Sequence, residues 1–532
     1  MKNRLLLPLL AIILTASLAA CGGSNSSSAS PTTSIVSTSN YAVGGVISGL
    51  ASGSLTLKNN GGDALTVSVS SSTFTFATPL ANGAAYAVTV GAQPSGLICT
   101  VTNGTGMVAS ADVTNVAVAC ATTAYEVGGT VSGLSSGASV VLQDNSSNST
   151  TVSANGSFTF DTPLANGTSY AVSVLTQPSG LYCSVTNGVG TVANSAISNV
   201  AVTCTTPFAY VTNQGDNTVS MYSIGSSGVW TLLSTPTVST GRTPNGITIN
   251  PAGTYAYVAN NGENTISMYS VGANGILMPL STPTVIAGPN PYQIAINSAG
   301  TYAYVINGST NVLMYSIGSN GILTPLTTPS VAAGNFTQSI TLNPAGTYAY
   351  VTNYGDSTVS MYAVGNNGIL TPLSTPTVAT GLGPPAITVN PAGTYAYVAN
   401  YAANTISMYA IGSNGVLTPL STPNVTANGN PFAITFTPAG AYAYVANSGS
   451  GTISMFAVGS NGILTPLSTP TIAAGSGAIA VKVNASGTYA YVLNGNISNV
   501  SMYSIGSNGI LTPLSTPTVA TGPSPWDFTI LH

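Results

Sequence analysis

The chain has 532 residues, only 3% of which are charged, and a formal net charge of −4. Five Lys and Arg residues in all cannot build the basic surface that phosphate neutralisation requires, so nucleic acids are excluded as partners. Because 44% of the residues are apolar, the composition is not that of a disordered chain either.

An export signal is predicted at the amino end, over residues 1–20. Lys2 and Arg4 precede an apolar run at residues 5–14, and a basic start followed by such a run is typical of secretory signals. The run is too short for a membrane-spanning helix. We therefore expect an exported protein.

The signal ends in Leu-Ala-Ala-Cys, which resembles the bacterial lipobox. The resemblance implies that Cys21 becomes the first residue of the mature chain and carries lipid; an ordinary secretory signal with a chance cysteine is the alternative. The Ser-rich residues 21–40 would then form a flexible tether to the membrane. Gly22 rather than Asp after the cysteine favours, by resemblance to sorted lipoproteins, the bacterial outer membrane or cell surface.

Two modules, residues 41–121 and 122–206, follow as a repeat. Tyr-Ala-Val-Gly-Gly at Tyr41 returns as Tyr-Glu-Val-Gly-Gly at Tyr125, 84 residues later, and Thr-Pro-Leu-Ala-Asn-Gly recurs at the same offset. Alternating apolar and polar runs between turn residues predict two small antiparallel β-sandwiches. They resemble immunoglobulin-like or carboxypeptidase-regulatory-like spacer modules, which implies a spacer role; ligand binding is the alternative.

Each module holds two cysteines at matching positions. Export places them outside the reducing cytosol, so we pair Cys99 with Cys120 and Cys183 with Cys204. The alternative, a metal site, would need Cys-x-x-Cys or nearby His spacing, and the sequence has neither.

Residues 207–532 contain seven copies of Ala-Tyr-Val-x-Asn, spaced 46 or 47 residues apart. A period of about 40 to 50 residues made of short strands indicates a β-propeller. Prolines gather in the fourth strand of each repeat, as expected of an outer edge strand. The copies begin at Ala209, Ala256, Ala303, Ala349, Ala396, Ala443 and Ala490.

The first strand of the repeat also occurs seven times, but out of phase. Its last copy is residues 528–530, whereas the first Tyr-Val strand, residues 208–211, has no first strand before it. The carboxyl end is therefore predicted to pair with residues 208–211 and to close the ring, which removes open sheet edges. The fold class expected is all-β: a closed seven-bladed propeller, most simply a monomer, preceded by two β-sandwiches.

The full repeat reads Asn-Pro-Ala-Gly-Thr-Tyr-Ala-Tyr-Val-x-Asn, then Thr-Ile-Ser-Met-Tyr and Asn-Gly-Ile-Leu-Thr-Pro-Leu. It resembles the YVTN-repeat and lactonase-like seven-bladed propellers, which include 6-phosphogluconolactonase-type enzymes and many surface proteins. Enzymes of this resemblance are expected to gather His, Arg and Glu on one face. No such set can be placed residue by residue on this chain, so no catalytic residue is predicted.

Charged residues of the propeller supply a weak candidate site. Asp216, Glu263 and Asp356 occupy the same loop in blades one, two and four, on the face that also carries Arg242. Three carboxylates could hold a divalent cation, although Asp and Asn are ordinary turn residues. We predict no cofactor and no metal. Lys482 replaces the Thr of five other repeats near the central channel, where it could steer an anion or simply pack its stem.

The function that the sequence favours is a lipid-anchored envelope protein that displays a propeller as a binding or structural scaffold. Its polar, uncharged face would suit a glycan, an envelope polymer or another protein. A lactone hydrolase is the alternative.

Overall fold

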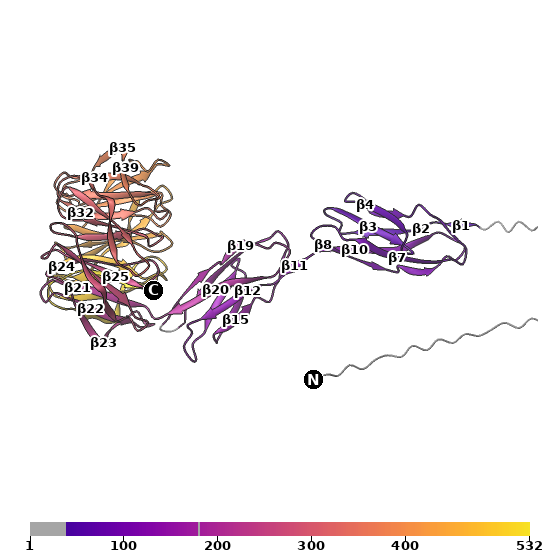
Figure 1. Cartoon of the computed structure of the whole chain (residues 1–532), viewed down its shortest axis with the longest axis horizontal. Coiled ribbons are helices and arrows are strands. Elements are labelled where there is room, and N and C mark those ends of the chain that lie inside the picture. Colours follow the sequence, from indigo (N-terminus) through magenta and orange to yellow (C-terminus); the bar gives the residue numbers. More distant parts are fainter. Residues whose placement is uncertain (1–38, 179–180, 532) are drawn as a thin grey trace, which may run out of the picture. The chain divides into compact units, whose positions relative to one another are not determined.

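The computed structural model of the protein describes residues 39–178 and 181–531 as an all-β chain (Figure 1). The predicted export signal, the lipid-attachment residue Cys21 and most of the tether lie outside these residues. Over the described ranges, no helix has the length and hydropathy that crossing a bilayer requires. The described residues divide into two compact units, with the boundary between Thr123 and Ala124, and each unit is described by itself below.

The first unit is a β-sandwich of two four-stranded sheets, ordered β5-β2-β10-β8 and β4-β3-β7-β9, with the short pair β1-β6. Its core includes fully buried Val43, Leu55 and Leu57. In β3, Leu55 and Leu57 alternate with exposed or half-buried residues, as a one-sided strand requires. The strands are β1 (Asn40–Tyr41), β2 (Val43–Ser48), β3 (Ser54–Asn59), β4 (Asp63–Ser68), β5 (Thr73–Thr75), β6 (Leu80–Ala81), β7 (Ala85–Ala92), β8 (Leu97–Thr102), β9 (Thr105–Met107) and β10 (Val113–Thr122).

One strand pair differs from the antiparallel sandwich expected from sequence. The first and last long strands, β2 and β10, run parallel through the centre of their sheet. A parallel pair needs a long crossover, and the whole second sheet supplies it here. The alternation of apolar residues predicts a sandwich but does not reveal strand direction.

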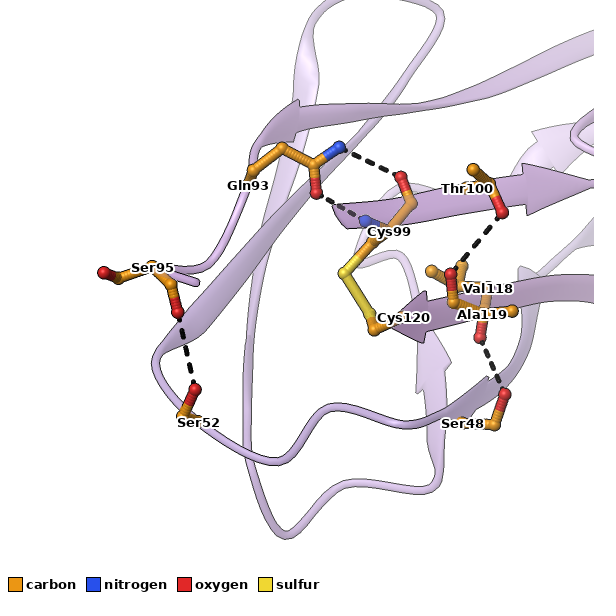
Figure 2. Close-up of a disulfide and its surroundings, with 9 residues drawn as sticks. All are labelled: Ser48, Ser52, Gln93, Ser95, Cys99, Thr100, Val118, Ala119 and Cys120. Atoms are coloured by element: carbon orange, nitrogen blue, oxygen red, sulfur yellow. Dashed lines mark hydrogen bonds between the residues drawn. A yellow bond between two sulfur atoms is a disulfide. The ribbon is translucent and has the colours of Figure 1, made fainter. Parts of the chain in front are cut away.

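A disulfide bond joins the neighbouring strands β8 and β10 (Figure 2). Cys99 and Cys120 lie directly opposite one another, with their Cα atoms 3.9 Å apart. The Gln93 side chain accepts a hydrogen bond from the Cys99 N–H at 2.7 Å and donates one to the Cys99 carbonyl at 3.0 Å. The amide of Gln93 thus fixes the strand edge next to the bridge.

The second sandwich repeats this plan with sheets β15-β12-β20-β18 and β14-β13-β17-β19 and the pair β11-β16. Cys183 and Cys204 form the equivalent disulfide, and Gln177 bonds to Cys183 as Gln93 does to Cys99. The strands are β11 (Ala124–Tyr125), β12 (Val127–Ser132), β13 (Val140–Asp144), β14 (Asn148–Val152), β15 (Gly156–Thr159), β16 (Leu164–Ala165), β17 (Ser169–Thr176), β18 (Tyr182–Thr186), β19 (Val189–Thr191) and β20 (Ile197–Thr205).

The remaining strands form seven four-stranded antiparallel blades, which confirms the predicted propeller. Given from the inner to the outer strand, blade 1 is β48 (Pro525–Leu531), β21 (Phe208–Asn213), β22 (Thr218–Ile224) and β23 (Trp230–Ser239); blade 2 is β24 (Pro244–Ile249), β25 (Tyr255–Asn260), β26 (Thr265–Val271) and β27 (Leu277–Ile286); blade 3 is β28 (Gln293–Ile296), β29 (Tyr302–Ile306), β30 (Asn311–Ile317) and β31 (Leu323–Ala332); blade 4 is β32 (Thr337–Leu342), β33 (Tyr348–Asn353), β34 (Thr358–Val364) and β35 (Leu370–Ala379).

Blades 5 to 7 continue in the same order. Blade 5 is β36 (Ala386–Val389), β37 (Tyr395–Asn400), β38 (Thr405–Ile411) and β39 (Leu417–Thr426); blade 6 is β40 (Pro431–Phe436), β41 (Tyr442–Asn447), β42 (Thr452–Val458) and β43 (Leu464–Ala473); blade 7 is β44 (Ala478–Val483), β45 (Tyr489–Asn494), β46 (Asn499–Ile505) and β47 (Leu511–Ala520).

Ring closure takes place as the sequence predicts. The last strand, β48, pairs antiparallel with β21, so that Phe528 lies opposite Val211 and Ile530 opposite Ala209. Blade 1 is therefore built from both ends of the domain, and the ring leaves no inner strand unpaired.

The repeat motif packs the blades against one another. The second tyrosine of each Tyr-Ala-Tyr-Val strand, such as Tyr257, is completely buried between neighbouring blades. Its hydroxyl donates to the Gly321 carbonyl in the turn of the next blade at 2.8 Å. Gly321 has a φ of 77°, and a side chain there would collide with the Tyr255 ring. The Asn-Gly turn and the tyrosine pair thus form one inter-blade contact.

Candidate functional site

A cavity of about 390 Å³ lies on the propeller axis and is lined by the inner strands of all seven blades. Its volume is within the range of small-molecule sites. Because the blades are near-copies of one another, each inner strand contributes equivalent positions. The position whose residue pairs with the Val of the Tyr-Val strand serves as the reference, for example Ile340 opposite Val351 and Phe528 opposite Val211.

Two residues before this reference position, the side chain differs in every blade. The reference residue itself is Ile in five blades, so the variation is not a general property of the strand. Six of the seven variable residues line the cavity; Asn245 is the exception. From blade 1 to blade 7 they are Trp526, Asn245, Tyr292, Gln338, Pro385, Phe432 and Ile479.

Three aromatic rings from different blades meet at this level of the channel, which we call the aromatic mouth (Tyr292, Phe432 and Trp526). The Trp526 ring of blade 1 lies edge-on to Tyr292 of blade 3, with centroids 5.7 Å apart, and to Phe432 of blade 6, with centroids 6.1 Å apart. All three side chains are half-buried. Trp526 therefore reaches rings that belong to blades beyond its own neighbours on both sides.

One residue further along, polar side chains bridge adjacent inner strands. The Asp527 carboxylate of blade 1 accepts a hydrogen bond from the Ile247 N–H of blade 2 at 3.2 Å. In the same way Gln293 of blade 3 accepts from the Ile340 N–H of blade 4 at 2.8 Å. These bridges satisfy backbone donors that face the channel, where no further strand could pair with them.

Asp527 is the one acidic residue that lines the cavity in the described chain. Burial raises the pKa of its carboxyl above the ordinary value, while the charge of Lys482 and the N–H groups of Ile247 and Phe528 oppose this shift. Burial also raises the pKa of Tyr292, and the neighbouring Asp527 adds to that effect. The surroundings of Asp527 therefore stabilise its protonated, neutral form relative to the same carboxyl in water.

Lys482 lies deeper, one residue past the reference position of blade 7. Its ammonium stands 5.7 Å from the centroid of the Phe528 ring, and the residue is half-buried in the cavity wall. Within the described residues it has neither an ion pair nor a hydrogen bond. Thr341, Thr388 and Thr435 occupy the equivalent position in blades 4 to 6 and line the same cavity.

The structure does not bring the predicted rim carboxylates together. Asp216, Glu263 and Asp356 lie exposed in separate loops, and no cluster of three or more His, Cys, Asp or Glu in the described chain could hold a metal ion. Asp216 accepts a hydrogen bond from the Thr218 hydroxyl at 2.7 Å. This is a turn contact, so Asp216 caps its own loop.

Asp356 and Arg242 each bond to a neighbouring loop on this face. The N–H and side-chain amide of Asn335 both donate to Asp356 at 2.7 Å, which lowers the pKa of that carboxyl. The exposed Arg242 guanidinium donates to the Gly262 carbonyl at 3.2 Å. Of the five charged candidates taken from the sequence, only Lys482 lines the channel.

Sequence reasoning missed the aromatic mouth and Asp527 because it searched for motifs that the repeats share. The informative positions are instead those at which the repeats differ. In an array of near-copies, a position that takes seven different residues is not fixed by the packing that all blades share, and aligning the blades on the Tyr-Val strand exposes it.

Comparisons with known proteins agree with this architecture. The family described as Lactonase, 7-bladed beta-propeller matches residues 181–291, 275–386 and 374–529. No curated protein sequence matches the chain.

Solved structures similar to the chain show the same fold. A candidate 6-phosphogluconolactonase from Bacteroides fragilis is 19% identical, with a TM-score of 0.56, over 62% of this chain and 98% of its own. The periplasmic gluconolactonase of Pseudomonas aeruginosa is 18% identical, with a TM-score of 0.54, over 62% of this chain and 99% of its own. A protein from Lactobacillus plantarum is 21% identical, with a TM-score of 0.54, over 62% and 99%.

Proposed function

Because this chain belongs to the lactonase family of seven-bladed β-propellers, we propose that its functional site is the central channel and that the protein binds a carbohydrate there. The lipid anchor at Cys21, expected from the lipobox, would hold the propeller at the bacterial outer membrane or cell surface. The two disulfide-linked sandwiches would act as spacers between the anchor and the propeller.

The observation that carries this proposal is the aromatic mouth. Aromatic faces are electron-rich and attract the weakly positive C–H bonds that cover one face of a sugar ring. Tyr292, Phe432 and Trp526 remain partly exposed although they contact one another, so a flat ligand has a surface on which to stack. Gln338 and Ser339 at the same end of the cavity supply polar groups for sugar hydroxyls.

One of those polar groups lacks a hydrogen-bond partner among residues 39–178 and 181–531. The side-chain oxygen of Gln338 is buried and accepts no hydrogen bond in the described structure. A buried acceptor without a hydrogen bond destabilises the folded state by about 1 to 3 kcal/mol, unless a ligand or water donates to it. A sugar hydroxyl at the channel mouth would meet that need.

Titration calorimetry with a panel of envelope-derived and plant oligosaccharides tests the proposal. Trp526→Ala and Phe432→Ala should each weaken binding at least tenfold, about 1.4 kcal/mol. Phe336→Ala is the matched control, since Phe336 is 49% exposed and does not line the cavity. Equal affinity of Phe432→Ala and Phe336→Ala, or the absence of any carbohydrate ligand, would overturn the proposal.

The anchor is tested separately. Metabolic labelling with an alkynyl fatty acid should mark the wild-type chain and not the Cys21→Ala variant, which should leave the membrane fraction. Labelling of both proteins would place the lipid elsewhere.

A second candidate function is lactone hydrolysis, which Asp527 specifically favours. A buried carboxyl with a raised pKa next to a cation in a cavity is the kind of group that active sites contain. Asp527 would accept a proton from the attacking water, Lys482 would stabilise the carbonyl oxyanion, and the ring would open to a hydroxy acid.

A lactone panel, assayed with and without divalent metal, decides between the two functions. Hydrolysis that is abolished by Asp527→Asn and unaffected by Asp216→Asn and Arg242→Gln would establish the enzyme. Activity lost in the Asp216 and Arg242 variants instead would move the site to the loop face.

A further inference from the structure

The lower part of the channel contains a cation that the fold does not require. At the position of Lys482 five other blades have Thr and blade 3 has Ala295. Each of those residues pairs with the buried tyrosine of its own Tyr-Val strand, as Thr435 does with Tyr444 and Lys482 with Tyr491. Because Thr is compatible with the packing at this position in five blades, packing alone does not account for the lysine in blade 7.

The Lys482 ammonium makes no hydrogen bond in the described chain, whereas both oxygens of the Asp527 carboxylate accept one. Each oxygen of the Asp527 carboxylate accepts a backbone N–H, from Phe528 at 2.8 Å and from Ile247 at 3.2 Å. The structure contains no ion pair between Asp527 and Lys482, and in the described chain no protein group accepts a hydrogen bond from the lysine ammonium.

Two hydroxyls in the same cavity are also available. Thr388 and Thr435, in blades 5 and 6, hold the positions equivalent to Lys482 and line the cavity, and neither side chain makes a hydrogen bond in the described structure. An ammonium and two hydroxyls that line one cavity are a suitable donor set for an anion.

The aromatic mouth and this donor set are separated by a ligand-sized distance. Ile479, at the level of the mouth, and Lys482 are three residues apart in one strand, which is about 10 Å at about 3.3 Å per residue. Both line the same cavity. One ligand of one or two sugar rings can therefore reach both levels.

We propose that the channel binds an acidic saccharide, with a sugar ring stacked at the aromatic mouth and its carboxylate, phosphate or sulfate group at Lys482, Thr388 and Thr435. The inference rests on the proposed carbohydrate-binding function and assigns its ligand class.

Matched neutral and charged sugars test the assignment. Affinities for methyl glucoside, methyl glucuronide, glucose 6-phosphate and glucose 6-sulfate, and for the oligosaccharides that bind best, are measured for wild type, Lys482→Thr and Trp526→Ala. Lys482→Thr introduces the residue of five other blades, so it should fold and melt as wild type does. The charged ligands distinguish a carboxylate source from a phosphate or sulfate source.

Wild type should prefer at least one charged sugar over the neutral one by tenfold or more, and the preference should shrink as salt screens the lysine. Lys482→Thr should lose the preference and keep its affinity for the neutral sugar, while Trp526→Ala should lose affinity for both. Equal binding of neutral and charged sugars to wild type, or an unchanged preference in Lys482→Thr, overturns the inference and leaves the proposed function intact. If no sugar binds, both fail.

Discussion

Six of the seven interfaces between blades are near-copies, and the seventh, where blade 7 meets blade 1, is different. In the six, the buried tyrosine of one blade donates its hydroxyl to a glycine carbonyl of the next at 2.7–3.0 Å. A leucine follows that glycine turn in each of them, at Leu277, Leu323, Leu370, Leu417, Leu464 and Leu511.

At the closing interface Trp230 takes the place of that leucine. Its ring packs against Tyr491 of blade 7 at 4.9 Å and against Phe528 of the closing strand at 5.6 Å. Burial raises the pKa of Tyr491, and the adjacent Trp230 indole partly opposes this. The two groups are therefore close, yet among the described residues neither the Tyr491 hydroxyl nor the Trp230 ring N–H reaches hydrogen-bond geometry with a partner.

The difference shows what ring closure requires. The six repeated interfaces join blades that the chain already connects in sequence, whereas the seventh must also hold a terminal strand. Larger aromatic area replaces a buried hydrogen bond there, and burial of about 25 cal/mol per Å² makes that exchange favourable for rings as large as Trp230 and Phe528.

Removing the closing strand should have the largest effect. A chain lacking residues 525–532 loses the five pairings with β21 and the fully buried Phe528, and it exposes β21 as an open edge. We expect loss of the cooperative thermal transition and association into oligomers, measured by circular dichroism and size-exclusion chromatography. Removal of His532 alone is the control; a truncated chain that stays monomeric with an unchanged melting temperature would contradict the role of closure.

Phe528→Ile gives the closing strand the residue that five other inner strands carry. The smaller side chain leaves space beside Trp230, and the free energy of unfolding should fall by about 1 to 3 kcal/mol. Denaturant titration measures this change. Unaltered stability would mean that the aromatic cluster of Trp230, Tyr491 and Phe528 adds nothing to closure.

Two tyrosine-to-phenylalanine variants should separate the closing interface from the others. Tyr257→Phe leaves the Gly321 carbonyl without its donor and should cost about 1 to 2 kcal/mol. Tyr491→Phe removes a hydroxyl that has no hydrogen-bond partner in the described part of the chain, so stability should stay level or rise by up to about 1 kcal/mol. The two are compared by denaturant titration, and equal losses would show that Tyr491 is hydrogen-bonded in solution.

The smallest effect concerns pH. The folded state raises the pKa of Asp527 and so holds that proton more tightly than the unfolded chain does. The stability this supplies is complete below the ordinary pKa of 3.8 and is lost as pH rises through the folded value. Wild type should therefore lose stability relative to Asp527→Asn on going from about pH 3 to pH 7, as melting temperatures would show. The lowered pKa of Asp356 acts in the opposite direction but equally in both proteins.

Much of the fold follows from the sequence because the repeat is explicit. The seven Tyr-Val strands set the number of blades, and the out-of-phase copy at Phe528 identifies the closing strand. The parallel pair β2-β10 was not predictable, since alternation reports only which face a residue occupies.

The site was predictable only in part. Lys482 can be recognised from the sequence alone because it replaces a Thr that five other repeats share. Trp526 and Tyr292 each look like an ordinary apolar strand residue, and only the curvature of the ring brings blades 1, 3 and 6 around one axis. Asp216 and Glu263 shared a loop position in sequence, but the radius of the ring keeps such equivalent loops apart.

The seven-fold variable position at the channel mouth has an evolutionary consequence. Six of its seven residues line the cavity, and they differ from blade to blade while the Ile, Val and Tyr residues of the core are repeated. A duplicated array of this kind can exchange one ligand for another through single mutations at those six places, each on an already stable framework. Diversification among its relatives should therefore concentrate there.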